Sequence, residues 1–338
     1  MKAYVLAAPS DLRYREVEKP QCRPGWVLVQ VKAAGICSSD IPRIFVKGTY
    51  HFPTIPGHEF SGIVVQAADD AGQAWVGKRV GVFPLIPCQN CGQCAQGHYE
   101  LCSGYDYLGS RRDGGFAEYV EVPVWNLVAL PDSVPYEEAA MMEPLAVALH
   151  AVRQAGVRSG DTVAVIGSGM IGFSAAQWAV QLGAARVCVI GRNERKRELA
   201  QMFSGIQYCA DRLQEEFDVV IEAVGSNASI CRAVELTKPL GRLVLMGNPE
   251  GDVAFPQDIY WRILRRQLRV SGTWNSEYRC GRSSEWTQVR DALENGKISA
   301  KPLISHRFHQ DELEDGLTLM AEHKEPFCKI MTMWNVGR

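Results

Sequence analysis

A glycine-rich turn between two apolar segments constrains the fold of this chain more than any other feature. Residues 162–166 form a short run rich in β-branched side chains, and Gly-Ser-Gly-Met-Ile-Gly follows at 167–172. Such a run is typical of a strand buried on both faces of a parallel sheet. Residues 173–182 then have helical spacing, Gly183 ends that run, and 186–190 form a second apolar segment. Strand, turn, helix and strand together predict half of a Rossmann fold.

The three glycines of this turn predict a dinucleotide site. Gly167 permits a tight turn, Gly169 allows a pyrophosphate to approach the backbone, and Gly172 allows close packing of helix and strand. Met170 and Ile171 lie between the last two glycines and belong to the same expected site. The glycine pattern alone is also typical of ordinary turns, so the prediction depends on the whole strand–turn–helix–strand unit.

The residues after the second strand predict which dinucleotide binds. An NAD site places an acidic residue about 20 positions after the turn, where it binds the ribose hydroxyls. Gly191 occupies that place, and Arg192, Arg195 and Lys196 follow it. Because no carboxylate would repel a 2′-phosphate and guanidinium groups would bind one, NADP is favoured over NAD. The alternative is that these cations form a solvated first turn of a helix.

Length and charge limit the classes of protein that need to be considered. The chain has 338 residues, enough for about two domains, and a formal net charge of −2, which does not indicate a nucleic-acid surface. No apolar run approaches the roughly 20 residues that span a bilayer. Lys2 begins an apparent strand without a preceding signal peptide. We therefore expect a cytoplasmic protein with neither nucleic-acid nor membrane partners.

The pattern of apolar segments changes along the chain. Before residue 130 the expected strands are short and separated by Pro and Gly, which favours an antiparallel, barrel-like unit with long loops; they are residues 2–6, 26–31, 62–65 and 116–122. From about residue 159, strands alternate with helices as in a doubly wound sheet, with further strands at 217–222, 242–246 and 268–272. The tail is expected to form helices at 286–294 and 311–321 and a strand at 329–333 that could return to the first unit.

These patterns predict an α/β protein of two domains. Residues 149–276 are expected to form the Rossmann dinucleotide-binding domain. Residues 1–148 and 277–338 are expected to form a β-rich second domain.

Four of the eleven cysteines crowd into one loop, with the spacing Cys88-x2-Cys91-x2-Cys94-x7-Cys102. Zinc takes four ligands in a tetrahedron, and four thiolates leave no open position, so the expected site is a structural zinc. Free or oxidised thiols and an iron–sulfur centre are the alternatives. A nucleic-acid-binding zinc ribbon is disfavoured because the loop contains no Lys or Arg. Other cysteines, such as Cys188 and Cys209, lie in apolar runs and are interpreted as small core residues in a reducing compartment.

A second set of possible metal ligands is scattered along the chain. Cys37, the adjacent His58 and Glu59, and Glu143 offer a thiolate, an imidazole and carboxylates. Such a set can hold zinc and leave a position for water or substrate, as catalytic zinc sites do. Each residue also has an ordinary interpretation, for example a helix-start acid at Glu143. The spacing alone leaves open whether these residues share a metal.

Taken together, these motifs resemble those of zinc-dependent medium-chain dehydrogenases/reductases over essentially the whole chain. The matching segments are 35–40, 57–59, the four-cysteine loop, 113–119, 143–144 and the Rossmann turn. Within that family the chain is most similar to polyol dehydrogenases, through residues 40–45, 58–62 and 109–115. The resemblance implies that the β-rich domain is a GroES-like catalytic domain.

The resemblance also implies two Zn²⁺ per chain. A catalytic zinc would be bound by Cys37, His58 and Glu143, with Glu59 a ligand in some coordination states, and the structural zinc by the four-cysteine loop. The Asp that NAD-using polyol members carry at the end of the second Rossmann strand is absent, which again favours NADP. Ala223, Val224 and Gly247, at later strand ends, are expected to line the dinucleotide cleft.

The residues around the catalytic cysteine would move the alcohol proton. By resemblance, Asp40 would orient the ring of His58 by accepting a hydrogen bond from it. Ser39 would pass the proton towards solvent. Members of the family often have a histidine three residues after this serine, but Pro42 stands there in this chain. The outer part of the relay therefore departs from the family pattern.

The resemblance implies that the substrate is a secondary alcohol of a sugar alcohol, in particular a polyol phosphate such as galactitol 1-phosphate. Arg43, Arg111 and Arg112 would suit a phosphate, although they could also be solvated surface residues. Trp274 and Asn275 could contact the polyol or lie in an interface, and His51 could line the mouth of the pocket.

We keep two alternatives to this function. One is a dehydrogenase of an unphosphorylated small alcohol, polyol or sugar acid, and the other is a non-catalytic NADP(H)-binding sensor. The intact set Cys37, Ser39, His58 and Glu143 favours an enzyme. We expect the enzyme to be a homodimer or homotetramer.

Overall fold

Two compact units make up the chain in a computed structural model that describes residues 1–211, 213–249 and 251–335. The first unit consists of Met1–Glu143, Glu277–Gly296 and Leu303–Arg338, and the second of Pro144–Ser276 and Lys297–Pro302. The first unit therefore ends at 143 where 148 was expected. Residues 297–302 also belong to the second unit, and not to the first as expected.

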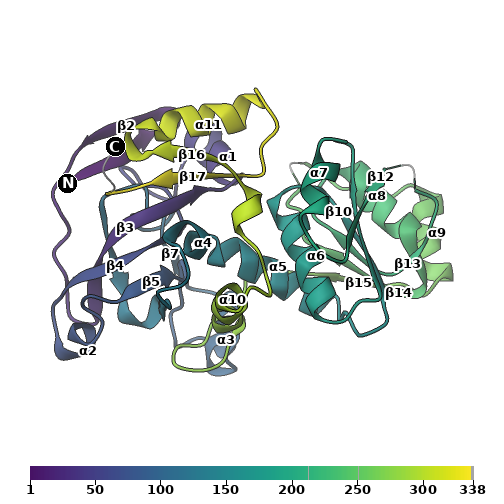
Figure 1. The fold of residues 1–338 in the computed structure, drawn as a ribbon, viewed down its shortest axis with the longest axis horizontal. Coiled ribbons are helices and arrows are strands. Elements are labelled where there is room, and N and C mark those ends of the chain that lie inside the picture. The colour runs from purple at the N-terminus through teal and green to yellow at the C-terminus, as the bar shows by residue number, and fades with distance from the viewer. Residues whose placement is uncertain (212, 250, 336–338) are drawn as a thin grey trace. The chain divides into compact units, whose positions relative to one another are not determined.

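The second unit is built on a six-stranded parallel sheet with the strand order β12-β11-β10-β13-β14-β15 (Figure 1). This is the order of a doubly wound Rossmann sheet, and the expected fold class is confirmed. Its elements are β10 (Thr162–Ile166), α6 (Met170–Gln181), β11 (Arg186–Gly191), α7 (Lys196–Gln201), β12 (Ile206–Ala210), β13 (Phe217–Glu222), α8 (Asn227–Leu236), β14 (Thr237–Leu245), α9 (Gln257–Arg265) and β15 (Arg269–Gly272).

The central strand β10 explains why the apolar run at 162–166 predicts a strand buried in a parallel sheet. It pairs in parallel with β11 on one side and β13 on the other. Its residues Val163, Ala164 and Val165 are fully buried, as an uninterrupted apolar run requires. The following helix begins at Met170, three residues before the expected start, because Gly169 serves as its N-cap.

Two cysteines of this unit, which the sequence predicts to be small core residues, also form a disulfide that was not expected. Cys188 on β11 and Cys209 on β12 form a disulfide. The two strands are parallel neighbours in a register that pairs Cys209 with Ile190, so the cysteines lie diagonally across the strand pair. The other nine cysteines do not form disulfides.

The first unit contains a seven-stranded, mostly antiparallel sheet with the order β16-β17-β3-β4-β5-β9, in which β8 also pairs with β3. The strands of the whole unit, in which β1 pairs with β2 and β6 with β7 outside this sheet, are β1 (Lys2–Ala8), β2 (Asp11–Glu16), β3 (Trp26–Ile36), β4 (Glu59–Ala67), β5 (Arg79–Val82), β6 (Leu85–Ile86), β7 (Asp106–Tyr107), β8 (Tyr119–Pro123), β9 (Leu127–Ala129), β16 (Ile304–His309) and β17 (Lys329–Met333). Its helices are α1 (Asp40–Pro42), α2 (Asp70–Gln73), α3 (Gly92–Ala95), α4 (Tyr136–Ala140), α10 (Glu285–Glu294) and α11 (Leu313–Glu322), and α5 (Met142–Gln154) begins at its end.

The C-terminal strand completes the sheet of the first unit. As expected, β17 returns to this unit, where it pairs antiparallel with β3 and parallel with β16. Helix α11 packs on β16 and β17 (Figure 1). Strands β3 and β4 are longer than expected, so that β3 ends at Ile36 and β4 begins at Glu59. Both of these ends lead into the candidate active site.

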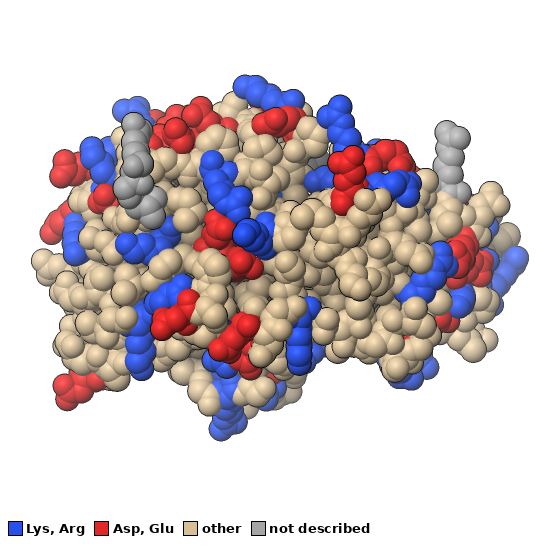
Figure 2. Space-filling view, in the orientation of Figure 1, with Lys and Arg blue, Asp and Glu red and all other residues tan. Residues whose placement is uncertain are grey.

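Among the residues that the structure describes, helices long and apolar enough to cross a bilayer are absent. On the face drawn in Figure 2, acidic and basic side chains are intermingled and do not form one continuous basic surface.

Candidate active site

Three of the four expected catalytic ligands come together at the ends of β3 and β4. Cys37 directly follows β3, His58 precedes β4, and Glu59 is its first residue. The antiparallel register pairs Gly35 with Glu59, which brings the two strand ends side by side. One ligand atom from each of Cys37, His58 and Glu59 lies within 4.8 Å of the others, and His58 and Glu59 are buried. Thiolate, imidazole and carboxylate at this spacing fit a zinc ion.

Glu143 lies next to this cluster but is not one of these three closely spaced residues. It is in the first turn of α5 and is 8% exposed. Its Oε1 accepts a 3.4 Å hydrogen bond from the hydroxyl of Tyr107, whose ring centroid is 5.8 Å from that of His58. Burial raises the pKa of the Glu143 carboxyl to about 7, and the charge of Glu59 adds to this shift while His58 opposes it.

Ser39 is positioned beside the cysteine of the cluster. Its hydroxyl donates a hydrogen bond of 3.3 Å to the sulfur of Cys37. This contact places a group that can carry a proton next to an expected metal ligand, which is the location that a relay requires.

A buried aspartate organises the loop that carries Cys37. Asp40 is fully buried and accepts hydrogen bonds from the Cys37 amide at 3.0 Å and from Arg43 Nη1 at 2.8 Å. His58 Nδ1 lies 3.4 Å from Asp40 Oδ1 but lacks good hydrogen-bond geometry to any described atom, so this contact is mainly electrostatic. Burial alone would lower the pKa of His58, but the charge of Asp40 outweighs it and keeps that pKa well above its usual value.

Sequence reasoning missed the lysine that pairs with Glu59. Lys329, at the start of β17, is 4% exposed. Its ammonium pairs with Glu59 Oε2 and donates a 3.0 Å hydrogen bond to the carbonyl of Ile36. The available signal was a single lysine within the apolar run Cys328–Met333, because a charge inside a buried strand requires a partner.

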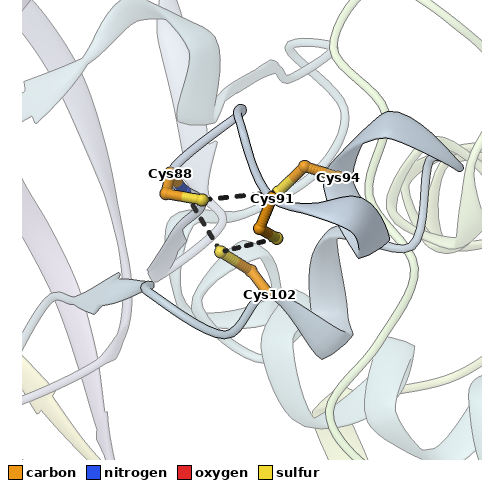
Figure 3. Close-up of side chains that lie close together, drawn as sticks. All are labelled: Cys88, Cys91, Cys94 and Cys102. Carbon is orange, nitrogen blue, oxygen red and sulfur yellow. Dashed lines mark hydrogen bonds between the residues drawn. The ribbon is translucent and has the colours of Figure 1, made fainter.

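The four-cysteine loop brings its thiols together as expected (Figure 3). The sulfurs of Cys88 and Cys94 are 4.0 Å apart, as are those of Cys91 and Cys102. A tetrahedral zinc with bonds of about 2.3 Å requires sulfur–sulfur distances of roughly 3.8 Å. Backbone amides of Cys94 and Ser103 lower the pKa of Cys91 to about 5, whereas burial raises the pKa of Cys94 to about 12. The donor set therefore fits zinc.

In the second unit, the glycine-rich turn has the backbone features that a dinucleotide requires. Gly167 has a φ of +117°, in the region that favours glycine. A Cβ at Gly172 would collide with the carbonyl of Gly167, so that glycine permits the close approach of helix and strand. A Cβ at Gly169 would have no neighbour within 4 Å, which leaves the backbone accessible at the start of α6. Met170 and Ile171 are the first two residues of that helix.

The loop after β11 carries the cations expected to select NADP. Arg192 and Arg195 are exposed, Arg192 forms no ion pair within the described ranges, and Lys196 begins α7. Arg197, which was not among the expected residues, is paired with Glu194 at 2.8 Å. Arg192 and Arg195 are therefore the arginines of this loop that remain available to bind a phosphate.

The ends of β13 and β14 are joined by a glutamate that sequence reasoning also missed. Glu222 is fully buried, and its Oε1 accepts hydrogen bonds from the amides of Val224 at 2.8 Å and Gly225 at 2.9 Å. Its carbonyl accepts the amide of Gly247 at 3.0 Å. Glu222 thus fixes the turn after β13, which includes Ala223, and the turn after β14, which includes Gly247; both belong to the expected cofactor site.

The three arginines proposed for a substrate phosphate have different surroundings. Arg43 is bound to Asp40, and Arg112 pairs with Asp106 at 2.6 Å, so both are already engaged with carboxylates. The Arg111 guanidinium lies over the rings of Tyr50 at 4.0 Å and Tyr105 at 4.6 Å. Among the described residues Arg111 pairs with no carboxylate, and its buried Nε has no hydrogen-bond partner. Arg111 is therefore the arginine best able to accept an anionic ligand.

The other residues expected to contact the substrate are His51 in the first unit and Trp274 and Asn275 in the second. His51 Nε2 contacts the carbonyl of Arg111 at 3.0 Å, so it supports the arginine loop. Trp274 is 57% exposed. Asn275 has a φ of +58°, and its side-chain oxygen accepts the amide of Ser276 at 2.9 Å, which fixes the turn after β15.

Comparisons with known proteins agree with this geometry. Residues 23–132 match the family described as alcohol dehydrogenase GroES-like domain, and residues 171–295 match the family described as zinc-binding dehydrogenase. The chain is 36% identical to galactitol 1-phosphate 5-dehydrogenase of Escherichia coli K12, over 96% of this chain and 98% of that protein. It is 32% identical to erythritol/L-threitol dehydrogenase of Mycolicibacterium smegmatis, over 96% and 95% of the two chains.

Solved structures show the same similarity. The crystal structure of galactitol-1-phosphate dehydrogenase from Escherichia coli superposes with a TM-score of 0.88 at 32% identity and covers 98% of this chain and 100% of its own. A zinc-binding dehydrogenase from Sinorhizobium meliloti 1021, bound to NADP, also superposes with a TM-score of 0.88, at 30% identity and 98% coverage of each chain.

Proposed function

We propose a specific reaction for this chain, which belongs to the zinc-dependent medium-chain dehydrogenase/reductase family and is an oxidoreductase of its polyol branch. The reaction interconverts a secondary alcohol of a polyol phosphate, such as galactitol 1-phosphate, and the corresponding ketone, with NADP as the hydride acceptor. The observation that carries this proposal is the cluster of Cys37, His58 and Glu59, in which His58 and Glu59 are buried.

Each residue of the cluster has a role in the proposed reaction. Cys37, His58 and Glu143 would hold the catalytic zinc, and Glu59 would be available as a further ligand. A zinc ion bound there would polarise the substrate oxygen, which would ease the loss of the hydroxyl proton and the transfer of a hydride from the adjoining carbon to NADP. Ser39, which is hydrogen-bonded to Cys37, would carry the alcohol proton away. Asp40 would hold His58 in orientation through the contact at 3.4 Å.

A second zinc ion would have a structural role in the four-cysteine loop. The sulfur–sulfur distances of 4.0 Å support tetrahedral coordination by Cys88, Cys91, Cys94 and Cys102. No position would remain open for substrate, so this ion would stabilise the loop only. The proposal therefore requires two zinc ions per chain.

The preference for NADP is supported by the exposed Arg192 at the end of β11 and by the NADP bound in the related Sinorhizobium meliloti structure. Residues 167–172 would bind the pyrophosphate, and Ala223, Val224 and Gly247 would line the cofactor. Because NADP is an intracellular metabolite, we place the enzyme in the cytoplasm.

We propose that Arg111 binds the substrate phosphate. Tyr50 and Tyr105 hold its guanidinium by cation–π contacts, and no described carboxylate competes for it. Ring contacts connect this position to the metal cluster, since Tyr105 lies 6.3 Å from Tyr107 and Tyr107 lies 5.8 Å from His58, all measured between centroids. A polyol bound at the cluster could therefore extend its far end towards Arg111.

A substrate panel tests this proposal directly. Purified enzyme is assayed with several polyols and their phosphates, each with NADP and with NAD. We expect kcat/KM to favour the phosphorylated substrate, and Arg111→Leu to lower that preference by roughly ten- to a hundredfold, the effect of one lost charge-assisted bond. Arg112→Leu is the matched control, because Arg112 is already paired with Asp106. Equal kcat/KM for a polyol and its phosphate would instead favour the unphosphorylated alternative.

We also propose that the enzyme is a homo-oligomer assembled through the open edge of the Rossmann sheet. β15 is the last strand of this sheet and all four of its residues are exposed. The apolar side chain of Val270 on this strand is 40% exposed, and those of Trp261 and Leu264 on the preceding helix α9 are 42% and 55% exposed. An exposed strand edge with apolar neighbours favours pairing with a second copy. Light scattering would give the mass, and Val270→Lys should shift it to the monomer.

A further inference from the structure

The carboxylate of Glu59 is restrained by a buried cation. The side chains of Lys329 and Glu59 are 5% and 1% exposed, and their ion pair joins the first residue of β17 to the first residue of β4. Lys329 also donates a hydrogen bond to the carbonyl of Ile36, one residue before Cys37. Burying a lysine is costly unless its charge is paired, and Glu59 is the carboxylate that pairs with this ammonium.

We propose that Lys329 is a positioning residue that restrains Glu59 at the edge of the metal cluster, so that one coordination position remains open for substrate. This inference rests on the proposed catalytic zinc. In this arrangement Glu59 is a reserve ligand, available when the substrate leaves but held back while the substrate is bound.

The local geometry supports such a restraint. The Oε2 atom of Glu59 is bound by the ammonium of Lys329 and occupies space left by Gly35, where a Cβ would come within 2.5 Å of it. Yet a carboxylate oxygen of Glu59 also lies within 4.8 Å of the ligand atoms of Cys37 and His58. The carboxylate is therefore shared between an ammonium on one side and a metal position on the other.

The charges of the site lead to the same inference. Cys37, Glu59 and Glu143 would together carry three negative charges when ionised, whereas a zinc ion supplies only two positive charges. The ammonium of Lys329 balances the third. Without it, Glu59 would retain its charge in a buried position, and the metal would be the nearest cation able to neutralise it.

This inference predicts an effect opposite to that of a purely structural role. If Lys329 restrains Glu59, its removal lets Glu59 bind the metal, so the catalytic zinc should be held more tightly while turnover falls. If Lys329 serves only to stabilise the sheet, its removal should loosen the cluster and speed the loss of zinc. The direction of the change in metal release therefore separates the two roles.

The experiment measures zinc release from the loaded enzyme into a chromophoric chelator. In Lys329→Met, which keeps the side-chain length but removes the charge, we expect release of the catalytic zinc to be at least tenfold slower and kcat to be at least tenfold lower. Lys329→Arg should restore both values to near those of the wild type. Zinc in the four-cysteine loop is the internal reference and should be released at an unchanged rate.

Further variants connect the effect to Glu59. In the double variant Glu59→Gln/Lys329→Met, zinc release should be no slower than in the wild type, because the reserve ligand is gone. If Lys329→Met does not fold, Lys329→Gln, whose amide can still donate to Glu59, should slow release to a smaller extent. Unchanged or faster zinc release in the folded single variant would overturn the inference. A wild-type enzyme that holds zinc only in the four-cysteine loop would instead overturn the proposed function on which it rests.

Discussion

Gly191 ends β11 against Tyr208, so closely that a Cβ at this position would lie 2.6 Å from the phenolic oxygen. That hydroxyl donates a 2.7 Å hydrogen bond to the carbonyl of Asn193 and so fixes the turn that carries Arg192. An introduced aspartate would have to displace Tyr208 and Ser168, so cofactor preference is better tested at Arg192 than at Gly191.

We expect Arg192→Leu to weaken NADP binding by about tenfold and to leave NAD binding unchanged, because one charge-assisted contact to the 2′-phosphate is lost. Calorimetric titration with each cofactor measures the two Kd values. Arg197→Leu is the control, since Arg197 is already paired with Glu194 and its loss should not alter the preference. Equal Kd values for NAD and NADP in the wild type would show that Arg192 is only a solvated surface charge.

The two proposed zinc sites should respond differently to substitution. Cys91→Ser should remove one zinc and lower the free energy of unfolding by several kcal/mol, because binding of a structural zinc contributes about 10 kcal/mol or more to folding. His58→Ala should keep the fold and abolish turnover. Metal analysis together with urea denaturation measures both effects. Cys280→Ser, at an exposed free cysteine, is the control and should change neither. Fully loaded wild-type enzyme with one zinc per chain would contradict the scheme.

The parts of the site that could be predicted from the sequence are those encoded locally. The glycine turn lies within one strand–turn–helix unit, and the four cysteines lie within one loop, so spacing alone indicated their geometry. Cys37, His58 and Glu59 required one further step, the antiparallel pairing of β3 and β4. The family resemblance supplied that step, because spacing left open whether the three residues share a metal.

The features that could not be predicted depend on long-range register. Lys329 reaches Glu59 only because β17 pairs with β3, and nothing in the residues around Glu59 indicates a cation 270 positions away. The Cys188–Cys209 disulfide depends on a diagonal relation between β11 and β12. The sequence favours Arg43 as a free phosphate-binding residue, because it indicates a contact of Asp40 with His58 and does not show that Asp40 also binds Arg43.

If Ser39 carries the alcohol proton, Ser39→Ala should lower kcat by roughly a hundredfold while the fold is kept. Ser39→Thr should retain most of the activity, because its hydroxyl can still donate to Cys37 as the serine does at 3.3 Å. Steady-state kinetics with the best substrate of the panel measures kcat for each variant. Near-wild-type turnover in Ser39→Ala would mean that the proton leaves by another route.

The stability of the Rossmann unit should depend on pH through Asp218, which connects the starts of β10 and β13. Its Oδ2 accepts hydrogen bonds from the amide of Thr162 at 2.9 Å and its hydroxyl at 2.6 Å, and Lys238 pairs with Oδ1 at 3.0 Å. Burial alone would raise the pKa of Asp218, but these hydrogen bonds and the charge of Lys238 outweigh it and lower the pKa to about 2.

A carboxyl group whose pKa is lower in the folded than in the unfolded chain stabilises the fold above its unfolded pKa, which is about 3.9 for Asp. That contribution is lost as the pH falls from about 4 to about 2. Asp218→Asn should therefore reduce the free energy of unfolding at pH 7, by about 1 kcal/mol and not the full linkage value, because the side chain is 35% exposed. Urea denaturation of both proteins from pH 7 to pH 3 should show a constant difference that shrinks below about pH 4. A difference that persists undiminished at pH 3 would mean that the hydrogen bonds act without the charge.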